Sequence, residues 1–359
     1  MKRSAAQRGF TLLELLAVIA IVGLMVGLIL PSFSRARRQA NTTNCSTNLR
    51  TLGQGLAIYA NEYSDMLVPH RMPKLDGEQW SVHILGGLKY RPTFLAMLGT
   101  QIGIPPFEDP KPTRSAVDCE GEPGDRQNYA STTYVCPEVA NWTDERNACY
   151  GYNYQFLGNA RLRNDADPLS FKNWPVFFSR MKGPAQTVAI GDSLGTAAAF
   201  PSFRRTPYEG ENRRCDKTLS EAALAQNPTF NGRSLNARGN EGIALDPPVV
   251  DPAAGEVAAH EGDVAGGAGQ QTSLATPPGG WSGLVSYEGG EAYRSAVDLR
   301  HGRRANILWL DGRVSLETLE SLGYWVENDG SVGIGDLETR QGNNRFWSGE
   351  QRNRVWLDR

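Results

Sequence analysis

The chain has 359 residues, in which 37 Lys and Arg stand against 39 Asp and Glu, a formal net charge of −2 near neutral pH. Its basic residues are scattered rather than clustered, so we expect no electrostatic surface for nucleic acid. The 39 Gly and 21 Pro favour a loop-rich domain over a compact helical one. This length allows one large domain or two small ones, and we favour a single domain with insertions.

The N-terminal region holds the most apolar stretch of the sequence. Between Leu12 and Leu30 the only charged residue is Glu14. A helix over residues 10–30 would extend about 30 Å, the thickness of a bilayer's hydrocarbon core. The apolar run is longer than that of an ordinary signal peptide and has no small-residue cleavage site behind it, so we expect it to remain as an anchor.

The charges around this stretch indicate its orientation. Three basic residues within the first eight positions favour a cytoplasmic N-terminus, although three arginines between positions 35 and 38 weaken the rule. The predicted location is therefore the inner membrane of a bacterium, crossed once, with the C-terminal domain periplasmic or on an extracellular filament.

Gly9-Phe10-Thr11-Leu12-Leu13-Glu14 resembles the processing site of type IV prepilins and type II secretion pseudopilins. The resemblance implies that a prepilin peptidase cuts between Gly9 and Phe10 and methylates the new amino group. It also implies that Glu14 stays in the helix as an assembly residue, which fits the cost of an unpaired carboxylate in hydrocarbon. The alternative is a plain signal anchor, which leaves the placing of Gly9, Glu14 and Pro31 unexplained.

The helix is predicted to continue, now amphipathic, over residues 32–63. Apolar residues recur there at three- and four-residue steps and predict a stripe that lies on a sheet. The stripe consists of Leu49, Leu52, Leu56, Ala60 and Tyr63. We expect Pro31, Gly53 and Gly55 to weaken or bend the helix, because proline removes a backbone donor and glycine lacks side-chain restraint.

Several later motifs are similar to a pilin-like family abundant in planctomycete-type bacteria. They are Asn48-Leu49-Arg50, Tyr134-Val135-Cys136-Pro137, Tyr150-Gly151-Tyr152-Asn153, the run from Thr187 to Ser193, and a final signature. The final signature consists of Arg300-His301-Gly302 and Asp311-Gly312, with nine residues between His301 and Asp311.

This final signature has the pattern of a hairpin. We predict a strand over Ala305 to Leu310, a type I′ turn at Asp311-Gly312, and a return strand from Arg313 to Leu316. A short helix over Ser315 to Leu322 is expected to follow.

Two further segments differ from the rest in composition. Residues 231–283 are rich in Ala, Gly, Pro and acidic residues and are predicted to form a low-complexity insertion that buries little. The tail from Arg340 interleaves arginines with Phe346, Trp347 and Trp356. Such a tail could bind a polymer at the cell surface, but we favour packing of its aromatic residues onto their own domain.

Five cysteines lie beyond the membrane segment, at Cys45, Cys119, Cys136, Cys149 and Cys215. The predicted orientation places them in an oxidising compartment, where disulfides form. The last four allow three pairings, which the sequence leaves open, and Cys45 would remain odd. A zinc site is disfavoured, because no two cysteines have the C-x₂₋₄-C spacing from which such sites are usually built.

A different class of function is suggested by Gly191-Asp192-Ser193-Leu194, which matches the nucleophile motif of GDSL esterases. Asp298 and His301 have the spacing of that family's Asp/His pair, so Asp298 would orient His301 and His301 would deprotonate Ser193. The sequence lacks the family's Gly-x-Asn-Asp element between these blocks. In that family the nucleophile follows the first strand of a doubly wound domain. Such a domain would here have to be built largely from residues 231–283, which lack the apolar runs that its strands need.

Other candidate ligands are explained more simply. His70, His83 and His260 have no partner at metal-ligand spacing and are expected to be ordinary polar residues. Glu327 to Ser331 has oxygen ligands that suit calcium, as in some pseudopilins, but an Asn-Asp-Gly turn explains the same residues.

We therefore predict an α+β, pilin-like structural subunit without enzymatic activity or cofactor, in which a long N-terminal helix packs on a small antiparallel sheet. Its partners would be the prepilin peptidase, other pilin or pseudopilin subunits and the inner membrane. The expected parts are a basic leader (1–9), a transmembrane and assembly segment (10–31), an amphipathic continuation (32–63) and a soluble domain (64–359).

Overall fold

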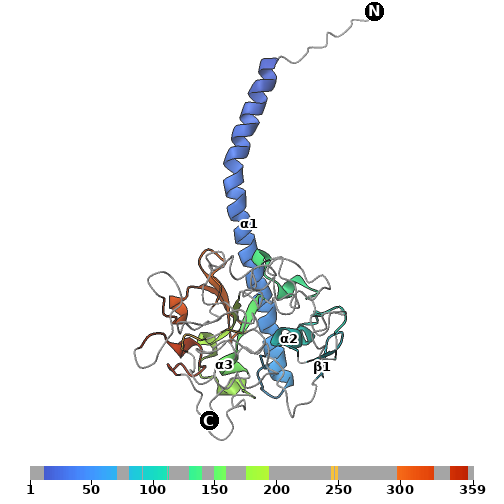
Figure 1. The fold of residues 1–359 in the computed structure, drawn as a ribbon, viewed down its shortest axis with the longest axis vertical. Coiled ribbons are helices and arrows are strands. Elements are labelled where there is room, and N and C mark those ends of the chain that lie inside the picture. The colour runs from blue at the N-terminus through green and yellow to red at the C-terminus, as the bar shows by residue number, and fades with distance from the viewer. Residues whose placement is uncertain are drawn as a thin grey trace, which may run out of the picture.

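A computed structural model describes residues 12–70, 81–90, 92–110, 112, 129–139, 149–158, 175–193, 244–245, 247–249, 297–326 and 340–354. The predicted α+β class is confirmed: one long helix packs on a small, mostly antiparallel sheet. The helix projects far beyond the domain (Figure 1).

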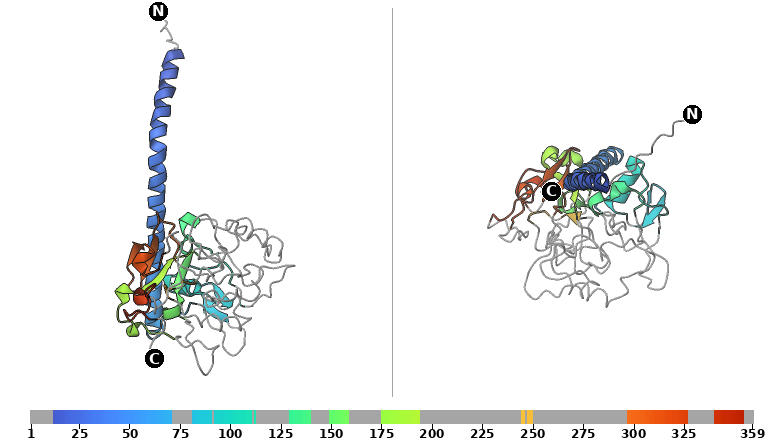
Figure 2. Two further views of the ribbon diagram at one scale, coloured as in Figure 1. Left: turned by 60° about the vertical axis from the view of Figure 1, so that its left-hand side comes forward. Right: turned by 90° about the horizontal axis from the view of Figure 1, so that it is seen from above.

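Helix α1 spans Leu12–Glu62 without interruption. Its 51 residues correspond to about 77 Å at 1.5 Å per residue. The described side chains of residues 12–40 are exposed, and only the C-terminal part of α1 is buried against the domain. Seen from above in Figure 2, α1 lies between α2 (Phe94–Ile102) on one side and the C-terminal strands on the other.

The main sheet has five strands in the order β5-β3-β4-β6-β7. Their bounds are Tyr150–Asn153 for β3, Val188–Asp192 for β4, Ala244–Leu245 for β5, Ala305–Trp309 for β6 and Val314–Glu317 for β7. All neighbours pair antiparallel except β3 and β5, which are parallel. The sheet therefore joins segments that are spread between residues 150 and 317.

A β-bulge decides which face of the sheet each β4 side chain occupies. Val188 pairs with Trp309, but Ile190 pairs with Leu308, so the register shifts between them. Ile190 and Leu308 belong to the core under α1, whereas Val188 and Trp309 belong to the core on the other face. A bulge re-aims the residues that follow it. Asp192, two positions after Ile190, consequently shares the face that α1 covers.

The remaining elements surround this unit. A separate hairpin pairs β1 (Ser81–Ile84) with β2 (Gly87–Tyr90), and a short helix α3 (Tyr154–Leu157) follows β3. Six 3₁₀ turns occur in the described residues: Thr132–Tyr134, Pro137–Val139, Phe178–Arg180, Pro184–Gln186, Glu320–Leu322 and Asn344–Phe346.

The two glycines in the buried half of α1 serve close packing. A Cβ at Gly53 would lie 2.8 Å from Leu308 Cδ1, and a Cβ at Gly55 would lie 2.8 Å from Ile102 Cγ2 and 3.2 Å from the Leu98 carbonyl oxygen. α1 continues through both positions, so neither glycine ends the helix; the expected bend stays a prediction. Because glycine has no Cβ, β6 can approach the helix backbone at Gly53 and α2 can approach it at Gly55.

The predicted apolar stripe is confirmed except at its last member. Leu49, Leu52, Leu56 and Ala60 are buried, whereas Tyr63 is 46% exposed. Because α1 ends at Glu62, Tyr63 lies beyond the helix, where its ring stacks on that of Tyr59 with centroids 4.2 Å apart. Tyr59 is buried and takes the predicted place of Tyr63.

The C-terminal hairpin forms where it was predicted, but its turn is of another type. Gly312 has φ +90°, whereas Asp311 is not among the residues with positive φ, so a type I′ turn is excluded. Gly312 N donates to Trp309 O at 2.9 Å, and Trp309 N donates to Arg313 O at 2.8 Å. These bonds describe a type I turn followed by a glycine bulge. The predicted helix after Ser315 is reduced to the 3₁₀ turn at Glu320–Leu322.

Part of the predicted insertion at 231–283 belongs to the sheet. Leu245 lies in β5 and is fully buried, and Val249 is 3% exposed. Asn344 holds Val249 by two hydrogen bonds, accepting from its N at 2.8 Å and donating to its O at 2.6 Å. The expectation that this segment buries little is thus wrong for residues 245 and 247–249, which are buried. Apart from residue 244, the rest of the segment lies outside the described residues.

Candidate functional site

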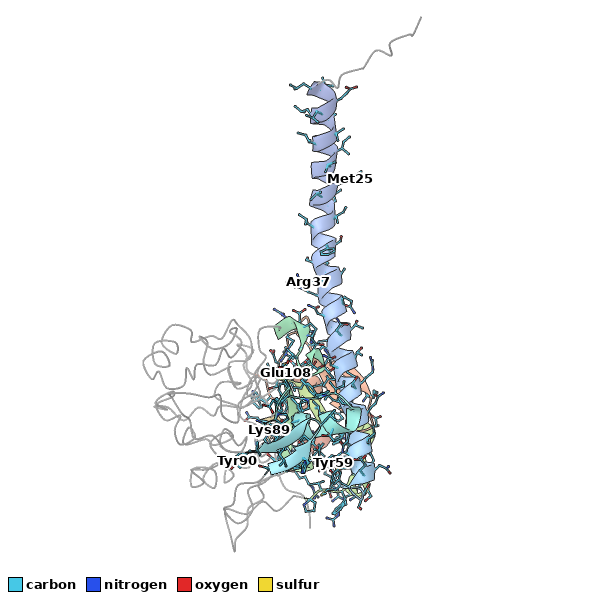
Figure 3. The ribbon with its side chains drawn as sticks, turned by 90° about the vertical axis from the view of Figure 1, so that its right-hand side faces the viewer. Met25, Arg37, Tyr59, Lys89, Tyr90 and Glu108 are labelled. Atoms are coloured by element: carbon cyan, nitrogen blue, oxygen red, sulfur yellow. The ribbon has the colours of Figure 1, made fainter. Side chains whose placement is uncertain are left out.

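The exposed half of α1 is apolar around its whole circumference. Large hydrophobic side chains from Leu12 (81% exposed) to Phe33 (68% exposed) are not covered by any described part of the protein. Figure 3 shows these side chains projecting on all sides of the helix around Met25. Within the described residues, α1 is the one helix long and apolar enough to cross a membrane. Glu14 lies in this half, and Gly9 and Phe10 lie outside the described residues.

The helix enters the domain at a group of chemically reactive side chains. Cys45 is the first buried residue of α1. Around it lie Cys136, between two 3₁₀ turns, Asp192, the last residue of β4, and His301, in the loop before β6. One potential ligand atom from each of the four lies within 4.8 Å of the others. We call these four residues the neck cluster.

Contacts within the neck cluster are short and direct. The Cys45 thiol donates to Asp192 Oδ1 at 3.2 Å, His301 Nε2 lies 3.3 Å from Asp192 Oδ2, and Cys136 Sγ lies 3.6 Å from His301 Nε2. Both cysteines and Asp192 are fully buried, and His301 is 7% exposed. Four polar side chains thus converge in a place from which water is largely excluded.

Neighbouring groups hold this geometry. Asp192 Oδ2 also accepts from Asn306 N at 2.6 Å, and the Tyr150 hydroxyl lies 3.2 Å from Cys45 Sγ. Cys136 N donates to Cys149 Sγ at 2.8 Å.

The tautomer of His301 follows from the hydroxyl beside it. Thr42 Oγ1 donates to Arg38 O at 2.9 Å and lies 3.1 Å from His301 Nδ1. Since the hydroxyl proton goes to Arg38, Thr42 Oγ1 accepts from Nδ1–H of the ring. In the neutral ring the lone pair is then on Nε2, which faces Cys136 and Asp192.

Burial and charge shift the acidities in the neck cluster. Burial raises the pKa of Asp192 to about 6, although the positive charge of Arg300 opposes the rise. Burial likewise raises the pKa of Cys45, whereas for Cys136 the burial effect is overcome by a hydrogen bond with Cys45 and by the charge of Arg300, which lower its pKa to about 4. For His301 burial opposes protonation, but the hydrogen bond with Cys136 and the charge of Asp192 raise its pKa.

The three residues of the esterase hypothesis are close in space but differently connected. Asp298 Oδ2 accepts from Arg300 Nε at 2.8 Å, and Arg300 also donates to the Ser193 carbonyl oxygen. Both ring nitrogens of His301 face other groups, Nδ1 facing Thr42 and Nε2 facing the neck cluster. Ser193 itself is 1% exposed. These contacts do not form the Ser193–His301–Asp298 relay that the hypothesis requires.

The other candidate residues are placed as follows. Cys45, Cys136 and Cys149 form no disulfide in the structure, and Cys119 and Cys215 lie outside the described residues. The possible calcium segment 327–331 and His260 also lie outside them. His70 is buried and His83 is exposed. Sequence reasoning missed the neck cluster, because its members come from four separate segments and no local spacing connects them.

The tail packs onto its own domain, as favoured from the sequence. Trp347 is fully buried and its Nε1 donates to Leu322 O at 2.9 Å. Phe346 is partly buried against the same core. Trp356 lies outside the described residues.

Comparison with known protein families shows that residues 4–30 match the family described as the prokaryotic N-terminal methylation motif. No curated protein and no solved structure matches the chain. The matched residues include Gly9, Phe10 and Glu14. Together with the exposed apolar helix, the motif supports a type IV pilin- or pseudopilin-like protein.

Proposed function

We propose that the protein is a structural pseudopilin or pilin-like subunit that is processed by a prepilin peptidase and assembled into a filament of a type II secretion-like or type IV pilus-like apparatus. The observation that carries this proposal is the division of α1 into an apolar half exposed on all sides and a half buried in the domain. The motifs at 134–153 and 300–312 would place it in the planctomycete-type pilin-like family.

The exposed half needs two successive environments. Before assembly, its apolar circumference suits the hydrocarbon core of the inner membrane, with the C-terminal domain on the periplasmic side. In a filament, the same surface would pack against the helices of neighbouring subunits, with the soluble domains outside. The described part of the domain leaves this surface uncovered, which supports assigning it first to the membrane and then to neighbouring subunits.

Glu14 gives the assembly step its specificity. A carboxylate in an apolar environment is costly unless it meets an opposite charge or a donor. The methylated amino group of Phe10 in a neighbouring subunit, released by cleavage after Gly9, would supply that charge. Removal of the leader would therefore precede correct packing of the helices.

Cleavage is tested by replacing Gly9 with Val in the full chain and following the size of the membrane-bound protein in cells that contain a prepilin peptidase. Gly9→Val should leave the leader attached, and Ala5→Val, a matched change within the leader, should be processed normally. Processing of Gly9→Val at the normal rate would contradict the proposed cleavage site.

Assembly is tested by Glu14→Leu. This variant should insert into the membrane as the wild type does, since its span becomes more apolar, but it should be depleted from the sheared filament fraction. Glu14→Asp, which keeps the charge, should restore part of the incorporation. Equal incorporation of Glu14→Leu and wild type would refute the role given to this residue.

The two other functions considered from the sequence have less support. A serine hydrolase would need His301 to face Ser193, but its ring nitrogens face Thr42 and the neck cluster. A polymer-binding tail would need exposed aromatic residues, but Trp347 is fully buried.

A further inference from the structure

We infer that the neck cluster is a structural zinc site, with Cys45 Sγ, Cys136 Sγ, Asp192 and His301 Nε2 as its four ligands. The inference does not depend on filament assembly, because it rests only on side chains of the folded domain. The cysteine spacing in the sequence disfavoured a zinc site. The fold nevertheless brings together four ligand side chains from separate segments of the chain.

The distances suit tetrahedral coordination. With bonds of about 2.3 Å to sulfur and about 2.0–2.2 Å to nitrogen and oxygen, neighbouring ligand atoms of a tetrahedral zinc site lie roughly 3.3–3.8 Å apart. The separations in the neck cluster are 3.2 Å for Cys45 Sγ to Asp192 Oδ1, 3.3 Å for Asp192 Oδ2 to His301 Nε2 and 3.6 Å for His301 Nε2 to Cys136 Sγ. The first distance ends at Asp192 Oδ1 and the second at Oδ2, and the four ligand atoms lie within 4.8 Å of one another. Rotation of the side chains toward a common centre would therefore be needed for one ion to bind all four.

The donor set selects the metal. Two thiolates and an imidazole favour a soft or borderline ion in tetrahedral geometry, which is the preference of zinc and not of calcium or magnesium. All four positions are filled by protein atoms that are buried or nearly so. A closed site of this kind is structural, because no position remains for a water or a substrate.

The surrounding groups prepare the ligands for a metal. Thr42 accepts from Nδ1–H of His301 and so leaves the lone pair of Nε2 free to coordinate, as outer-shell partners of metal-bound histidines do. Tyr150 is placed to donate its hydroxyl to the Cys45 sulfur. Asn306 N holds Asp192. Without a metal, the side chains are held together by protons, such as the one that the Cys45 thiol donates to Asp192 Oδ1. A divalent cation would take the place of these protons.

The position of the site gives it a mechanical role. Cys45 belongs to α1, Cys136 to the segment between the 3₁₀ turns, Asp192 to the central strand β4, and His301 to the loop before β6. One ion would thus fix the helix to three parts of the domain at the point where α1 leaves it. A force applied along α1 would act on this junction first.

Metal analysis of the full-length protein, purified in detergent with a thiol reductant, tests the site. Wild type should hold about one zinc per chain, as expected for a four-ligand structural site. Cys45→Ser and His301→Gln should each lower the content to less than about a tenth, because loss of a ligand opens the site. Thr43→Val, at an exposed position of α1 beside the neck cluster, is the matched control and should keep the zinc.

A second measurement does not depend on the folding of variants. Wild type stripped by a chelator and loaded with Co²⁺ should show thiolate-to-cobalt charge transfer in the near ultraviolet and the visible bands of tetrahedral cobalt. Thr42→Val, which removes only the hydroxyl beside His301, should weaken zinc binding about tenfold or more. The inference is overturned if reduced wild type incubated with zinc retains less than about a tenth of an ion per chain. It is equally overturned if peptide mapping of protein from an oxidising compartment finds Cys45 in a disulfide with Cys136 or Cys149.

Discussion

Replacing Gly55 by Ala should destabilise the domain, although the same change stabilises most helices. In an exposed helix, Gly→Ala is worth about 1 kcal/mol in favour of the folded state. Here the new Cβ would lie 2.8 Å from Ile102 Cγ2 and 3.2 Å from the backbone oxygen of Leu98, closer than ordinary contact. Overpacking of this kind costs about 1–3 kcal/mol, so the net result is a loss of about 1 kcal/mol.

Urea unfolding of the full-length chain in detergent, followed by tryptophan fluorescence, measures this loss. The midpoint should fall by a few tenths of a molar, given a slope of about 2–3 kcal/mol per molar. Gly55→Val should lose more, because its two methyl groups have less room. Gln54→Ala, at the exposed neighbouring position, should change the free energy of unfolding by less than about 0.5 kcal/mol. A Gly55→Ala protein more stable than the wild type would refute the close packing of α1 on α2.

Trp347→Ala should lower the free energy of unfolding by about 3–5 kcal/mol in the same assay, because it empties a fully buried site and removes the bond to Leu322 O; a change below 1 kcal/mol would contradict the packing of the tail. Ser193→Ala should leave hydrolysis of p-nitrophenyl acetate at the level of the wild type, since the ring nitrogens of His301, the base that would activate Ser193, face Thr42 and the neck cluster. A loss of measurable turnover in Ser193→Ala would revive the hydrolase hypothesis.

The parts of the fold that the sequence predicted are those with strong local patterns. Leu49, Leu52 and Leu56 are spaced as one face of a helix, and that face is buried. The apolar run from Ile307 to Leu310 and the Asp311-Gly312 pair indicated a hairpin, which the structure contains. The same pair did not determine the turn type, because a glycine after a type I turn satisfies the chain as well as a type I′ turn does.

The parts that could not be predicted depend on contacts between distant segments. Nothing local showed that Leu245, within an Ala- and Gly-rich stretch, pairs with β3. Likewise, Gly53 and Gly55 looked like weak points of a helix until the positions of β6 and α2 were known. The neck cluster is the strongest case, since the bulge in β4 that turns Asp192 toward Cys45 has no sequence signature of its own.

The mass of the mature N-terminus tests the central claim most directly. Protein isolated from membranes of cells that carry a prepilin peptidase should yield an N-terminal peptide that begins at Phe10 and carries one added methyl group. A peptide that still begins at Met1, or one that begins at any residue other than Phe10, would contradict the account of this chain as a processed pilin-like subunit.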